Sequence, residues 1–75
     1  MLVKLLGVYK MDFTSSKGDR VEGHKLYVCY PEENVTGVKT EEVFVKKNIK
    51  LPDVKINDDI NIYFNSKGKV ESVVK

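Results

Sequence analysis

The chain has 75 residues, of which 41% are hydrophobic and 32% charged, and 13 basic against 11 acidic residues give a formal charge of +2. This composition fits a small globular domain better than a disordered chain, and the length allows one domain, residues 1–75, without a large catalytic cleft between two domains. No segment approaches the roughly 20 apolar residues of a membrane-spanning helix, so no membrane partner is expected. The single cysteine, Cys29, cannot form an intramolecular disulfide, and we expect a reducing, cytoplasmic location.

Residues 2–13 predict one long β-strand, because large and charged side chains alternate there with a period of two. On this alternation we expect one side of the strand to carry Val3, Leu5, Tyr9, Met11 and Phe13. The other side would carry Leu2, Leu6 and Val8 with the charged residues Lys4, Lys10 and Asp12. Gly7, in the middle of the strand, predicts a β-bulge or a sharp bend of the kind that a small barrel needs in its first strand.

A turn at residues 14–19 separates this strand from a second one, residues 21–30. Pro31 ends the second strand, because proline has no N–H group to donate to a ladder. A loop of seven residues, 31–37, leads to a third predicted strand, residues 38–47, which contains an apolar run near its end.

Residues 48–59 form no amphipathic helix, since Pro52 would cost about 3 kcal/mol in a helix interior. The fourth strand is expected at residues 60–64 and the last at residues 70–74. Between them, residues 65–69 have the length and the glycine of a hairpin loop.

Five strands with short connections predict an all-β fold, a five-stranded antiparallel OB-like barrel without the usual helix between the third and fourth strands. An SH3-like barrel is the alternative, because it also has five short strands and no helix. The OB-like barrel requires a long, bent first strand, and Gly7 within a strand of twelve residues favours it.

Groups that could catalyse a reaction are few. His24 is the only histidine, and Cys29 lies within an apolar strand, where a small buried thiol is expected. One histidine and one cysteine do not supply the three or four converging ligands of a metal site, and no glycine-rich phosphate loop is present. The sequence therefore predicts neither an enzyme nor a bound cofactor.

Aromatic residues are the more informative feature, since the chain has four tyrosines and three phenylalanines but no tryptophan. A small barrel uses three or four rings in its core, and Tyr9, Tyr27, Tyr30 and Tyr63 exceed that need. Rings interleaved with basic residues on a sheet favour single-stranded nucleic acid, because bases stack on the rings while cations follow the phosphates. Alternatively, the tyrosines only fill the rim of the barrel, with one polar end in water.

The basic excess lies in residues 1–30, where five basic residues stand against three acidic ones. An excess of this size permits a polyanionic partner without requiring one. For such a partner, Tyr9, Tyr27 and Tyr63 would stack bases, and the expected phosphate contacts are Lys10, Lys17, Arg20 and Lys25, with Lys46 and Lys47 as further candidates.

Residues 13–27 resemble the first β-hairpin of the filamentous-phage gene V single-stranded DNA-binding proteins. The resemblance rests on a Phe-Thr opening, a turn at glycine and a return through Gly to Tyr, carried here by Phe13, Thr14, Gly18, Gly23 and Tyr27. That family places arginines in this hairpin to meet phosphates. In this chain Ser16 and Val21 stand at those positions, next to Lys17 and Arg20.

The resemblance implies an OB-like barrel, a homodimer and cooperative coating of single strands, DNA more than RNA, in a phage or mobile element. A dimer is also expected because a barrel of this size buries little surface alone. The alternative function is a small protein-interaction module or accessory subunit that captures a partner through a sheet edge or an aromatic groove.

Overall fold

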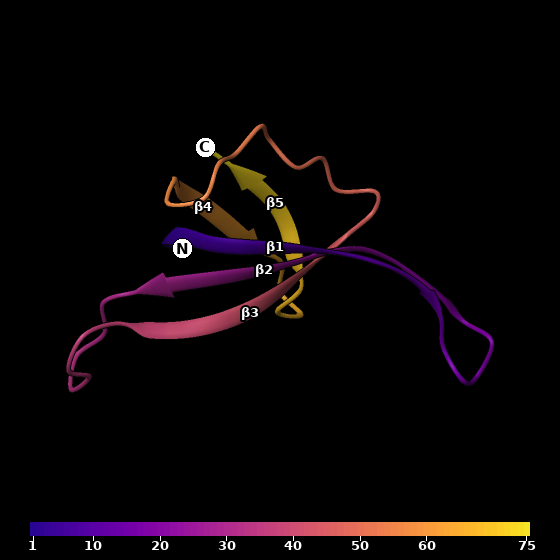
Figure 1. Ribbon diagram of the computed structural model, residues 1–75, viewed down its shortest axis with the longest axis horizontal. Coiled ribbons are helices and arrows are strands. Elements are labelled where there is room, and N and C mark those ends of the chain that lie inside the picture. The colour runs from indigo at the N-terminus through magenta and orange to yellow at the C-terminus, as the bar shows by residue number, and fades with distance from the viewer.

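The computed structural model describes all 75 residues, which form five β-strands and no helix (Figure 1). The strands are β1 (Leu2–Thr14), β2 (Arg20–Tyr30), β3 (Lys39–Lys46), β4 (Asp59–Phe64) and β5 (Val70–Val74). Every bound lies within one residue of the predicted one, and the predicted all-β fold with five strands is confirmed. The structure has no helix that is long and apolar enough to cross a membrane.

The strands form one antiparallel sheet in the order β3-β2-β1-β4-β5. β1 is the central strand: it pairs with β2 along most of its length and with β4 only through Leu2–Lys4. This long, shared first strand agrees with the OB-like prediction. The sheet curls until Cα atoms of β3 and β5 come within 8 Å of each other, but no ladder joins these two strands. The fold is therefore barrel-like and open between β3 and β5.

A β-bulge interrupts β1 at Leu6. Leu5 pairs with Val28, and the neighbouring Tyr27 pairs with Gly7, so Leu6 has no partner on β2. The bulge predicted at the middle of the strand is thus confirmed. An extra residue on one strand of a pair changes the face on which all later side chains of that strand lie.

The bulge overturns the predicted division of β1 into two faces. We name the face that packs on the core the inner face and its reverse the outer face. Val3 and Leu5 are buried on the inner face, whereas Tyr9 is 57% exposed and lies on the outer face. The prediction that Tyr9, Met11 and Phe13 share a face with Val3 and Leu5 is therefore wrong. It assumed a regular alternation of faces along the whole strand, whereas the bulge at Leu6 shifts that alternation by one residue.

The core is built only from aliphatic side chains. Each strand contributes two residues to one buried cluster: Val3, Leu5, Leu26, Val28, Val43, Val45, Ile60, Ile62, Val70 and Val73. None of the seven aromatic residues is buried in it. The interior therefore uses fewer rings than the three or four expected, and every ring lies at least partly at the surface.

The connection between β3 and β4, residues 47–58, covers part of this core. As predicted, it contains no helix. Ile49, Leu51 and Val54 are half-buried and pack against the buried cluster. An irregular segment thus removes from water the apolar surface that the curled sheet leaves uncovered at this point.

We predict that Gly23→Ala destabilises the protein by roughly 1–3 kcal/mol, the usual cost of forcing extra volume into a packed site. A Cβ atom at Gly23 would overlap the carbonyl oxygen of Val45 and lie 3.0 Å from the ring of Phe44. Gly7→Ala is the matched control, because a Cβ there meets only Tyr27, whose nearest ring atom is 3.4 Å away. Urea unfolding measures both variants, and equal stability of the two would contradict this packing.

Candidate nucleic-acid interface

The outer face of β1, β2 and β3 carries a row of two rings with a lysine between them. Tyr9 of β1 lies opposite Lys25 of β2, and Lys25 lies opposite Phe44 of β3. Tyr9 is 57% exposed and Phe44 is 37% exposed. Side chains directly opposite each other in a sheet are on the same face, so this row presents two aromatic surfaces with a cation between them.

A neighbouring row brings a third ring to the same face. Tyr27 of β2 lies opposite Gly7 on one side and opposite Glu42 on the other. The ring of Tyr27 lies close to Gly7, and the ring of Phe44 lies close to Gly23 in the same manner. Because a glycine has no side chain, a ring from the next strand can cover its backbone, and this holds both rings low against the sheet.

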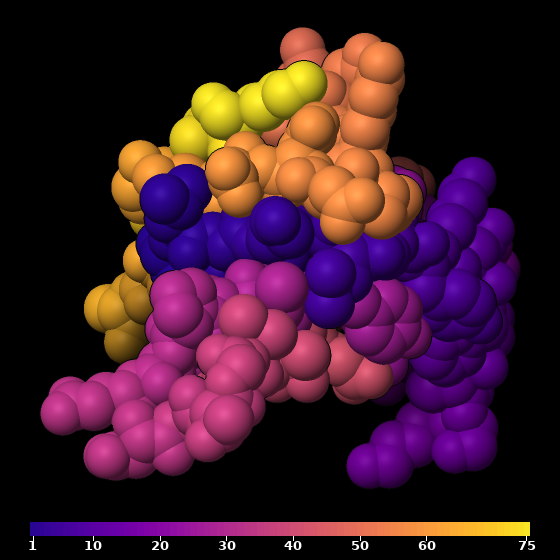
Figure 2. Space-filling model, turned by 60° about the vertical axis from the view of Figure 1, so that its left-hand side comes forward, coloured from indigo at the N-terminus to yellow at the C-terminus, as the bar shows by residue number.

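The outer face continues along the part of the β1–β2 hairpin that extends beyond the core. Its next rows are Met11, Gly23 and Lys46, followed by Phe13 and Val21. In Figure 2 the end of this hairpin and the β2–β3 loop project on either side of β2 and β3, and the surface between them is hollowed. We call the set Tyr9, Lys25, Tyr27, Phe44 and Lys46 the aromatic face.

Of the seven residues predicted from the sequence, the structure brings Tyr9, Lys25 and Tyr27 together. Lys10 lies on the inner face of the hairpin, opposite His24. Lys17 is exposed in the turn at the hairpin tip and forms no ion pair.

Tyr63 lies apart from the other predicted tyrosines. It is 47% exposed, but β4 pairs with β1 through Leu2 and Asn61, so Tyr63 lies beyond the N-terminal end of β1. Tyr9 is seven residues away in the other direction, which is about 23 Å along an extended strand. Tyr63 therefore does not share a surface with Tyr9 and Tyr27.

Carboxylates neutralise several of the expected cations. Arg20 forms ion pairs with Asp12 and with Glu22, the latter at 3.0 Å, and Lys47 lies 2.7 Å from the same Glu22 carboxylate. On the aromatic face, Lys25 lies 3.7 Å from Glu42. Lys46 has no such partner.

The contact between Glu22 and Lys47 shifts the pKa of both groups. Hydrogen bonds to Lys47 and then to Arg20 hold the pKa of Glu22 below its ordinary value of 4.5. The same contact raises the pKa of Lys47. Arg20 and Lys47 are thus engaged within the protein and are less available to a phosphate than the sequence implied.

Sequence reasoning missed Phe44, which completes the row with Tyr9. It lies in the apolar run of the third predicted strand, between Val43 and Val45, whose side chains are buried. Strict alternation within that run would have found it, because the residue between two inward-facing valines must face outward.

The remaining candidate groups, Cys29 and His24, both lie on β2. Cys29 is buried, as expected for a small apolar thiol. His24 is half-buried on the inner face, opposite Lys10 on one side and Val45 on the other. The 75 residues bring no three metal-ligating side chains together.

Comparison with known proteins gives no relative: no family model, no curated protein and no solved structure matches the chain. The hairpin resemblance therefore rests on residues 13–27 alone and stays a prediction.

We predict that Glu22→Gln flattens the pH dependence of stability in acid. The lowered pKa of Glu22 contributes stability that is present above about pH 4.5 and is lost as the pH falls through the folded-state value. The difference in free energy of unfolding between wild type and variant should therefore shrink on acidification. Urea unfolding from about pH 6 to about pH 3 measures it.

The matched control is Glu71→Gln, because Glu71 is exposed and has no ion-pair partner. This control should show no change with pH. If the difference in free energy of unfolding between wild type and Glu22→Gln stays constant across the same pH range, Glu22 does not stabilise the protein through its ion pairs with Arg20 and Lys47.

Proposed function

We propose that the protein binds single-stranded nucleic acid, DNA rather than RNA, on the aromatic face. The observation that carries this proposal is the row of Tyr9, Lys25 and Phe44 across three strands. Exposed rings with a cation between them are the two elements that a base and its phosphate require. The aliphatic core supports it further, because these rings are not needed to fill the interior.

The spacing of the rings favours an unpaired strand. Tyr9 and Phe44 are separated by two strand spacings, about 10 Å. This is about three times the 3.4 Å rise between stacked bases in one strand of a duplex. Bases that occupy both rings must be unstacked from each other, which a single strand allows at a much lower cost than a duplex.

Each residue of the aromatic face has a definite role in this proposal. Tyr9, Tyr27 and Phe44 stack bases, at about 1–3 kcal/mol for each base. Lys25 and Lys46 contact phosphates. Among the other predicted residues, Lys17 at the hairpin tip can extend the phosphate path, whereas Arg20 is held in ion pairs.

The wider setting belongs to the same proposal. We propose a strand-coating protein of a phage or mobile element that acts as a homodimer in the cytoplasm. The hairpin resemblance supports a strand-coating protein of a phage or mobile element. A core of ten aliphatic residues and several exposed apolar side chains support further burial in a dimer, and a cysteine without a disulfide partner supports a reducing compartment.

A protein-interaction module is the second candidate function, and one observation favours it. β3 ends the sheet, and its outer edge pairs with no other strand. Exposed edges of this kind can accept a strand from a partner. Binding that persists at high salt and after nuclease treatment distinguishes a protein partner from a nucleic acid.

Fluorescence anisotropy with labelled oligo-dT tests the proposal. Tyr9→Ala should weaken binding roughly 5- to 150-fold, because it removes one stacking surface worth about 1–3 kcal/mol. Tyr63→Ala is the matched control, since Tyr63 has similar exposure but lies away from the aromatic face, and it should bind as wild type does.

Affinity for oligo-dT should also fall with salt, by about 0.7 log units per log unit of salt for each phosphate that a lysine neutralises. No binding by the wild-type protein at micromolar concentration and low salt would refute the proposal, and equal losses in the two tyrosine variants would refute the assignment of the face.

We predict that Glu42→Gln strengthens oligo-dT binding several-fold. Its carboxylate lies 3.7 Å from the Lys25 ammonium group and beside Tyr27, where it both occupies the cation and repels a phosphate. The gain should be largest at low salt, because screening weakens both effects. Glu71→Gln removes the same charge from another strand and serves as the control. A weaker complex with Glu42→Gln would contradict this arrangement.

A further inference from the structure

The outer edge of β3 is an unused row of backbone hydrogen-bonding groups. β3 pairs only with β2, and no backbone hydrogen bond outside that ladder reaches residues 39–45. In an antiparallel pair, each strand directs alternate N–H and C=O groups away from its partner. β3 therefore presents such groups toward the opening of the sheet, where another strand can bind them.

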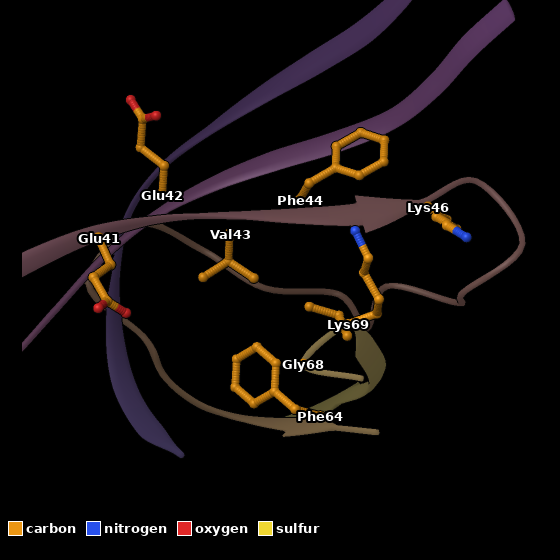
Figure 3. Close-up of a pocket in the computed structure, with 9 residues that line it drawn as sticks. Glu41, Glu42, Val43, Phe44, Lys46, Phe64, Gly68 and Lys69 are labelled. Atoms are coloured by element: carbon orange, nitrogen blue, oxygen red, sulfur yellow. The ribbon is translucent and has the colours of Figure 1, made fainter. Parts of the chain in front are cut away.

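A cleft of about 580 Å³ lies along this edge, between β3 and the β4–β5 hairpin (Figure 3). Its volume is within the range of ordinary ligand pockets. Val43 and Phe64 point toward each other across it, and Val70 also lines it. Free backbone groups and an apolar cleft thus lie side by side, which is what an extended peptide needs to place alternate side chains.

The two ends of the cleft carry opposite charges. Glu41 and Glu42 lie at the end where β3 begins, and Lys46 and Lys69 lie at the other end (Figure 3). Neither Lys46 nor Lys69 has an ion-pair partner. Such a distribution selects the direction in which a charged extended segment binds.

We propose that this cleft binds an extended peptide of a partner protein, which adds to β3 as an antiparallel strand. An antiparallel peptide begins beside Lys46 and ends beside Glu41. Its N-terminal end should therefore be acidic and its C-terminal end basic, with an apolar residue between them that enters the cleft against Val43 and Phe64. The cleft shares Phe44 and Lys46 with the aromatic face, whereas Glu41, Phe64 and Lys69 lie outside that face.

The proposal is tested with two labelled peptides of identical composition. The first is acetyl-Glu-Thr-Val-Thr-Val-Thr-Lys-amide, and the second exchanges its terminal glutamate and lysine. The full-length protein should bind the first about tenfold more tightly, because both charge pairs are attractive in one peptide and repulsive in the other. Equal affinity for the two peptides, or no binding of either, would overturn the proposal.

Two variants and one further readout complete the test. The double variant Glu41→Lys, Lys69→Glu leaves one acidic and one basic residue at each end and should lose the preference between the peptides, whereas Phe64→Ala should weaken both and leave oligo-dT binding unchanged. On binding, alternate backbone amides of residues 39–45 should gain protection from hydrogen exchange. Binding without that protection would show that β3 does not pair with the peptide, and an unchanged preference in the double variant would refute the assigned direction.

Discussion

The β-bulge at Leu6 is the constraint on which the rest of the molecule depends. One unpaired residue lets the same strand direct Val3 and Leu5 into the core and then Tyr9, Met11 and Phe13 away from it. If the same sequence paired with β2 without a bulge, the later side chains of β1 would exchange faces, and Lys10 and Asp12 would lie on the outer face instead. The residues of β1 before the bulge therefore help to build the core, whereas those after it form a hairpin with β2 that extends beyond the core.

Aliphatic side chains fill the core and aromatic side chains lie outside it, and this separation follows from the geometry of β1. The curled sheet leaves a narrow interior that valine, leucine and isoleucine fill, with help from Ile49, Leu51 and Val54 of the long connection. None of the seven rings belongs to this buried cluster, and those of Tyr27 and Phe44 lie over glycines on the reverse of the sheet. The packing of the core and the chemistry of the surface are consequently two results of one strand geometry.

Strand positions, the turns and the bulge could be predicted from the sequence, because alternation, glycine and proline act locally. The hairpin loop that contains Gly68 could be predicted for the same reason, because a glycine readily adopts the positive φ, here +78°, that such a loop requires. What could not be predicted depends on pairing between distant segments. The register decides that Phe44 lies in one row with Tyr9 and that Tyr63 does not. It also brings Asp12 of β1 to Arg20 and Glu42 of β3 to Lys25. No short-range pattern contains that information.

The location of the rings also has a spectroscopic consequence. The chain has no tryptophan, and its intrinsic emission comes from four tyrosines, three of which are exposed on strands while Tyr30 is half-buried. Unfolding changes the surroundings of exposed phenols little. A base stacked on Tyr9 or Tyr27 changes them directly, so the ultraviolet fluorescence of this protein reports on what covers its surface more than on whether its interior is intact.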